Sequence, residues 1–129
     1  MNALFLIGRI LFGGYFIYGG INHFTNLAAM SGYAGMKGVP LPQLAVAVAG
    51  ILLLAGGISV LLGICRVIGL ICLIAFLVPV TFIMHAFWAV SDPNMKMNDM
   101  VNFGKNLALL GAVLMMFAIP KPWPLSIKK

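Results

Sequence analysis

The chain has 129 residues, of which 63% are hydrophobic and only 8% are charged, and its formal net charge is +6. Soluble domains carry about a quarter charged residues, and disordered chains combine low hydrophobicity with high charge. The composition therefore excludes both classes and indicates an integral membrane protein. It also gives no support to nucleic-acid binding, because the basic residues form no patch interleaved with aromatic residues.

Charged residues divide the sequence into long uncharged intervals. Three of them, residues 10–36, 38–65 and 67–91, hold 27, 28 and 25 residues, and the fourth, 106–120, holds 15. A membrane-spanning helix needs about 20 predominantly apolar residues, so the fourth interval must extend backwards through Lys105. Continuous apolar runs favour helices over a barrel. The sequence therefore predicts an all-α integral membrane four-helix bundle, a single transmembrane domain over 1–129 with helices at about 3–24, 41–63, 67–89 and 98–119.

The connections between these helices differ in length. Residues 25–40 are predicted to form a glycine-rich loop, and residues 63–66 a tight turn. Asp92-Pro93-Asn94 is a turn signal within the third connection, 90–97. Cys65 and Cys72 are seven residues apart, about 10 Å along a helix, which is too far for a disulfide between them.

Basic residues near the ends of the spans predict the orientation, because positively charged loops stay in the cytoplasm. Five of them lie on the side of the two termini, namely Arg9, Arg66, Lys121, Lys128 and Lys129. Three lie on the opposite side, namely Lys37, Lys96 and Lys105. We therefore expect both termini in the cytoplasm. The stem of Arg9 is expected to extend so that its guanidinium reaches the membrane surface; the alternative is a buried partner within the bundle.

Polar residues gather toward the opposite, extracytoplasmic ends of three helices. The first helix carries Tyr18, Asn22 and His23; the third carries Thr81, His85 and Trp88 on one face; the fourth carries Asn98, Asn102, Lys105 and Asn106 on one face. Polar residues at membrane depth usually face the bundle interior or a cavity. We therefore predict a ligand-binding pocket formed by Asn22, His23, Thr81, His85, Trp88, Asn102, Lys105 and Asn106. Any carboxylate partner of Lys105 would have to be Asp92 or Asp99.

Three interpretations of this polar cluster are open. A quinone or another isoprenoid lipid could bind, with His23 or His85 donating to a carbonyl and Trp88 or Phe87 packing on the ring. A bis-histidine haem b or a metal ion is less favoured, because two histidines without an obvious third ligand form a weak motif; no metal ligand and no catalytic residue is assigned. The polar residues could instead hydrogen-bond one another and stabilise the bundle.

Several short motifs resemble the DoxX family of small membrane proteins. They are Gly8-Arg9, Gly19-Gly-Ile-Asn-His-Phe24, Lys37-Gly-Val-Pro40, Gly63-Ile-Cys-Arg66, His85-Ala-Phe-Trp88 with Asp92-Pro93, and Asn102-Phe-Gly-Lys-Asn-Leu-Ala-Leu-Leu-Gly111. The resemblance implies a four-helix bundle in the bacterial cytoplasmic membrane. It also implies a link to a thiosulfate:quinone oxidoreductase subunit and to membrane redox complexes that hold a thiol oxidoreductase and a superoxide dismutase. More distant relatives resemble cargo receptors and receptor chaperones.

One position departs from the family pattern. Many relatives carry an acidic residue in the second helix, where this chain has Leu53. The leading hypothesis is a quinone- or lipid-binding membrane subunit of a redox complex, with redox proteins as partners. The alternative is a non-enzymatic scaffold or chaperone-like membrane protein whose polar cluster is structural. Glycine-rich helix faces would serve the bundle or a homo-oligomer.

Overall fold

The computed structural model describes residues 1–127, and these residues form helices and connecting segments without a strand. Lys128 and Lys129, which were counted for the orientation, lie outside the described residues. The elements in chain order are α1 (Asn2–Thr25), α2 (Leu27–Met36), α3 (Pro42–Leu62), α4 (Arg66–Met84), the 3₁₀ turn η1 (Phe87–Ala89) and α5 (Pro93–Phe117). Four of them, α1, α3, α4 and α5, are long and apolar enough to cross a membrane. The prediction of an all-α membrane protein with four spans is therefore confirmed.

The structure differs from the predicted boundaries in three places. The segment predicted as a loop contains α2, a helix of 10 residues. The third predicted helix ends at Met84, where His85 leaves helical geometry with φ −116° and ψ 35°. The fourth begins at Pro93 rather than at residue 98, because Asp92 accepts a hydrogen bond from the Asn94 amide at 3.0 Å. The Asp92-Pro93 pair is thus a helix N-cap with proline in the first turn, and not an isolated turn.

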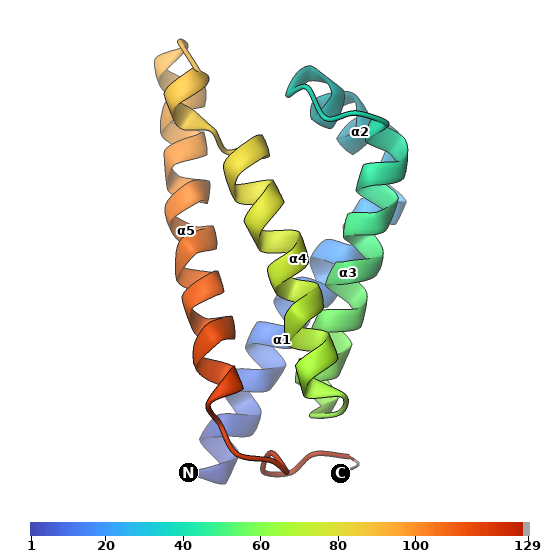
Figure 1. Cartoon of the computed structure of the whole chain (residues 1–129), viewed down its shortest axis with the longest axis vertical. Coiled ribbons are helices and arrows are strands. Elements are labelled where there is room, and N and C mark those ends of the chain that lie inside the picture. The colour runs from blue at the N-terminus through green and yellow to red at the C-terminus, as the bar shows by residue number, and fades with distance from the viewer. Residues whose placement is uncertain (128–129) are drawn as a thin grey trace.

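The spanning helices pack in the order α1, α3, α4, α5 (Figure 1). The start of α1 and the tail that follows α5 lie at one end of the bundle, which we call the termini end. The α2 helix and the connection between α4 and α5 lie at the other, which we call the distal end. Gly63 allows the tight return from α3 to α4, because its φ of 74° is a left-handed conformation that glycine adopts without strain. Which end faces the cytoplasm stays a prediction.

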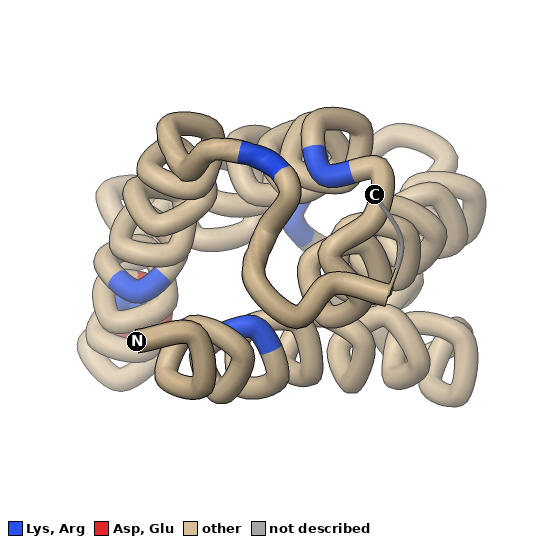
Figure 2. The backbone as a smooth tube through the Cα atoms, turned by 90° about the horizontal axis from the view of Figure 1, so that it is seen from below, with Lys and Arg blue, Asp and Glu red and all other residues tan. Residues whose placement is uncertain are grey.

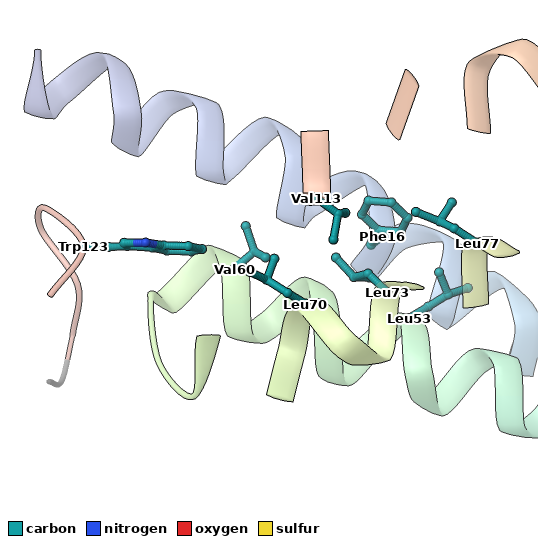
Figure 3. Packing of buried hydrophobic residues seen from close by; sticks show 8 residues of the cluster. All are labelled: Phe16, Leu53, Val60, Leu70, Leu73, Leu77, Val113 and Trp123. Atoms are coloured by element: carbon teal, nitrogen blue, oxygen red, sulfur yellow. The ribbon is translucent and has the colours of Figure 1, made fainter. Parts of the chain in front are cut away.

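A narrow apolar core runs along the bundle (Figure 3). All four spanning helices contribute to it, with Phe16 from α1, Val60 from α3, Leu73 from α4 and Val113 from α5. Trp123, from the tail, closes the core at the termini end, where its ring meets Phe5 edge-on at 5.6 Å between centroids. Many other apolar side chains point outwards, as expected of helices that face lipid.

Arginine side chains attach the tail to the helices at the termini end. Arg9 is only 2% exposed and donates to the carbonyl oxygens of Val60 at 3.0 Å, Leu61 at 2.8 Å and Pro124. Arg66 donates to the carbonyl of Ile119 at 2.7 Å. Seen from below, the tail crosses this end of the bundle, with cationic residues around it (Figure 2). The expectation that Arg9 extends to the membrane surface is therefore wrong, because the tail covers its guanidinium and supplies an acceptor.

Candidate ligand-binding site

A cavity of about 250 Å³ lies between α1, α4 and α5 toward the distal end; we call it the polar cavity because histidine, asparagine and lysine side chains lie on its otherwise largely apolar wall. Five of the eight predicted site residues line it, namely Asn22, His23, His85, Lys105 and Asn106. Its apolar wall includes Phe16, Leu53, Phe76 and Leu77. At least one residue of each predicted polar stripe therefore lies on the wall of this cavity.

The remaining three predicted residues do not line this cavity. Thr81 is 2% exposed and buried within the bundle. Asn102 lies one turn before Asn106 and accepts a hydrogen bond from Lys105 at 3.1 Å. Trp88 is 56% exposed on η1, so the prediction that it shares a helical face with Thr81 and His85 is wrong, because α4 ends before it. Its ring instead packs edge-on against Phe103 at 5.7 Å.

His23 is held against its own helix. Its Nδ1 lies 2.7 Å from the carbonyl oxygen of Gly19, one turn earlier in α1. A carbonyl oxygen only accepts hydrogen bonds, so Nδ1 carries the proton. The ring also meets Phe76 of α4 edge-on, at 5.9 Å between centroids. These two contacts set the position of His23 at the wall that α1 and α4 share.

His85 is held by a buried ion pair between two other segments. Its Nδ1 lies 3.2 Å from Oδ1 of Asp99, and the other carboxylate oxygen of Asp99 accepts from Lys37 Nζ at 2.7 Å. Asp99 is 1% exposed. The hydrogen bond to Asp99 raises the pKa of Lys37 above its ordinary value of 10.5. The cluster joins the end of α2, the end of α4 and the first turns of α5.

The sequence interpretation missed Asp99 and Lys37 as site residues. Asp99 was considered only as a partner of Lys105, whose ammonium instead donates to the Tyr15 hydroxyl at 3.0 Å and to Asn102. One signal was available. Asp99 is one of only two acidic residues in the chain and lies seven residues before Asn106, on the same helical face. A carboxylate at that position requires a buried partner.

A larger apolar groove of about 800 Å³ adjoins the polar cavity. It runs between α2, α3 and α4, and its walls include Tyr33, Leu44 and Ala75. Four residues line both spaces, namely His23, Phe76, Val80 and His85. The two histidines therefore stand at the boundary between a polar cavity and an apolar groove, an arrangement suited to a ligand with a polar head and an apolar tail.

Comparison with known proteins agrees with the motifs. The sequence model of the DoxX family matches residues 4–86, from α1 to the end of α4, and includes both histidines. No curated protein matches the chain, and no solved structure matches it. The family match covers well over half of the sequence and three of the four membrane-spanning helices, namely α1, α3 and α4. The chain is a multi-pass membrane protein of the DoxX family.

Proposed function

We propose that the protein binds an isoprenoid quinone and serves as the quinone-binding membrane subunit of a redox complex in the bacterial cytoplasmic membrane. The observation that carries this proposal is the boundary formed by His23 and His85 between the polar cavity and the apolar groove. A quinone headgroup would occupy the cavity of about 250 Å³, and its chain would follow the groove of about 800 Å³.

The chemistry of the walls favours a quinone over a phospholipid. The cavity is lined by aromatic residues, including Tyr15, Phe16 and Phe76, against which a flat ring can pack. Bidentate recognition of a phosphate typically uses arginine, and Arg9 and Arg66 instead bind carbonyl oxygens at the termini end. The aromatic lining therefore favours a flat ring as the headgroup, with hydrogen bonds to histidine, asparagine and lysine.

The protein would supply position and hydrogen bonds, while the quinone and a partner protein supply the electron chemistry. Cys65 and Cys72 are free, and neither lines the cavity or the groove. Cys65 directly precedes α4 at its start, whereas His85 follows the last residue of that helix. Thiol chemistry in the cavity would therefore come from a partner and not from these cysteines.

The direct test is to purify the protein in a mild detergent and to measure extracted quinone per chain. We expect close to one quinone per chain. Ala75→Phe, which narrows the groove, should lower this occupancy severalfold. Val78→Phe is the matched control, because Val78 lies on the same helix, is 39% exposed and does not line the groove. An absence of quinone, or a haem absorption band in its place, would overturn the proposal.

One observation favours the alternative of a non-enzymatic scaffold. Much of the polar cluster is satisfied internally, through the contacts of Asp99 with Lys37 and His85 and of Lys105 with Tyr15 and Asn102. A scaffold would keep its partner proteins after His85→Ala and Lys105→Ala, and it would purify without quinone. Loss of quinone together with retained association would instead assign these two residues to ligand binding.

A further inference from the structure

The hydrogen bonds of the two histidines determine which chemical groups the cavity accepts. In each ring Nδ1 faces an atom that only accepts, namely the carbonyl oxygen of Gly19 at 2.7 Å for His23 and the Asp99 carboxylate at 3.2 Å for His85. The Asp99 carboxylate is ionised, because it pairs with Lys37 at 2.7 Å. Both Nδ1 atoms therefore carry the proton, and in a neutral imidazole the other nitrogen, Nε2, is then an acceptor.

This arrangement bears directly on the expectation that His23 or His85 donates to a quinone carbonyl. A histidine that donates to a quinone carbonyl from Nε2 needs a proton on that atom, whereas a ring whose single proton is on Nδ1 presents a lone pair there. A lone pair facing a carbonyl oxygen leaves two acceptors without a hydrogen, whereas a hydroxyl group facing the same atom forms a hydrogen bond. Sites built to hydrogen-bond a hydroxyl discriminate strongly against analogues that lack it.

We infer that the cavity selects the reduced, dihydroxy form of its quinone, the hydroquinone, over the oxidised form, and that Asp99 sets this preference by fixing the proton of His85. This inference rests on the proposed function and adds the redox state of the bound headgroup to it.

The other polar groups of the cavity are compatible with a hydroquinone. Lys105 only donates, and a hydroxyl oxygen accepts from an ammonium while its own hydrogen points elsewhere. The amide of Asn106 both donates and accepts, so it serves either form. Asn106 is 5% exposed. The histidines are therefore the residues that discriminate between the two forms.

Asp99 acts through His85 and is a positioning residue. Asp99→Asn places an amide at the same position, and an amide nitrogen can donate to Nδ1 of His85. The proton of His85 is then free to occupy Nε2, from which it donates to a carbonyl. We therefore expect this substitution to weaken the preference for the hydroquinone without abolishing binding.

The test compares the affinities of a short-chain benzoquinone and its hydroquinone for the full-length protein in lipid nanodiscs under anaerobic conditions. We expect the wild type to bind the hydroquinone at least about tenfold more tightly. For a two-electron couple, a tenfold preference raises the midpoint potential of the bound ligand by about 30 mV. Redox titration of the bound ligand gives a second readout that needs no variant.

Asp99→Asn should reduce the preference to about threefold or less. Asp92→Asn is the matched control, because it removes the same charge from the start of the same helix, where Asp92 contacts the Asn94 amide and not His85. Its preference should equal that of the wild type. An unchanged preference in Asp99→Asn would overturn the role given to Asp99.

The outcomes separate the two proposals. If the wild type binds both forms equally, or the quinone more tightly, the inference is overturned while quinone binding stands. If it binds neither form, the proposed function is overturned and the inference falls with it.

Discussion

Gly13 of α1 and Gly57 of α3 face each other where these two helices are closest. A Cβ atom on Gly13 would lie 2.7 Å from the carbonyl oxygen of Gly57, and a Cβ on Gly57 would lie 2.8 Å from that of Gly13. These neighbours are backbone atoms, which do not move aside as a flexible side chain does. Ordinary carbon–oxygen contacts are about 3.3 Å or longer, so Gly13→Ala requires the helices to separate locally by roughly 0.6 Å.

A separation of this size weakens the contacts around the crossing. A radial gap of 0.5–1 Å forfeits about a quarter to a half of each dispersion contact, and overpacking typically costs about 1–3 kcal/mol. Part of this loss is offset, because alanine stabilises a helix by about 0.5–1 kcal/mol relative to glycine. Gly13→Ala should therefore lower the free energy of unfolding by about 1–2 kcal/mol.

Gly14 provides the matched control, because a Cβ there has no neighbour within 4 Å. Gly14→Ala should leave the free energy of unfolding unchanged or raise it by up to about 1 kcal/mol. The assay is reversible unfolding in mixed micelles by increasing mole fraction of a denaturing detergent, followed by circular dichroism. Equal stabilities of the Gly13→Ala and Gly14→Ala variants would refute the close crossing of α1 and α3.

Further predictions concern the two ends of the bundle. Arg9→Met should lower the free energy of unfolding by about 3–4 kcal/mol, because the carbonyls of Val60 and Leu61 lose their donor and charge-assisted hydrogen bonds contribute about 1.5–3 kcal/mol each. Arg9→Lys should lower it by about half as much. If Arg9→Met is as stable as the wild type in the unfolding assay, the buried position of Arg9 is contradicted. Trp123→Ala should lower the free energy of unfolding by about 3–5 kcal/mol in the same assay, because Trp123 is buried and this is the typical loss for a buried tryptophan. A loss below about 1 kcal/mol would show that the tail does not close the core. The pKa of Lys37 is raised in the folded state, so the Lys37–Asp99 pair stabilises the protein below pH 10.5, and this contribution is lost as the pH rises through the higher folded pKa. When the free energy of unfolding is measured against pH, Lys37→Met should therefore lack this loss at alkaline pH. Parallel stability profiles of the wild type and Lys37→Met would contradict the ion pair.

The sequence predicted the spans and the level at which the polar residues meet. Uncharged intervals located the four helices because charges are costly in hydrocarbon. Spacing along α1 and α5 predicted that His23 and Asn106 lie at a common level, and both line one cavity, whereas His85 reaches it from the segment that follows α4. These are local properties, since they depend only on helix length and on the rise and rotation per residue.

The features that the sequence did not reveal depend on contacts between distant segments. Lys37 and Asp99 are separated by 62 positions, so helical periodicity gives no information about their pairing. Arg9 lies at a depth from which its side chain could reach the surface, and only the path of the tail shows that Pro124 covers it. Trp88 was placed on a helix that ends earlier, where His85 turns toward Asp99.

The histidines themselves offer the most direct test of the ligand site. The chain contains two, so nitrogen-15 labelling of histidine gives two imidazole spectra in reconstituted protein, and His23→Gln assigns them. We predict that both rings carry their proton on Nδ1 and that added hydroquinone shifts both Nε2 signals in the direction of an accepted hydrogen bond. Rings protonated on Nε2, or Nε2 signals that stay unchanged while hydroquinone is bound, would contradict the account.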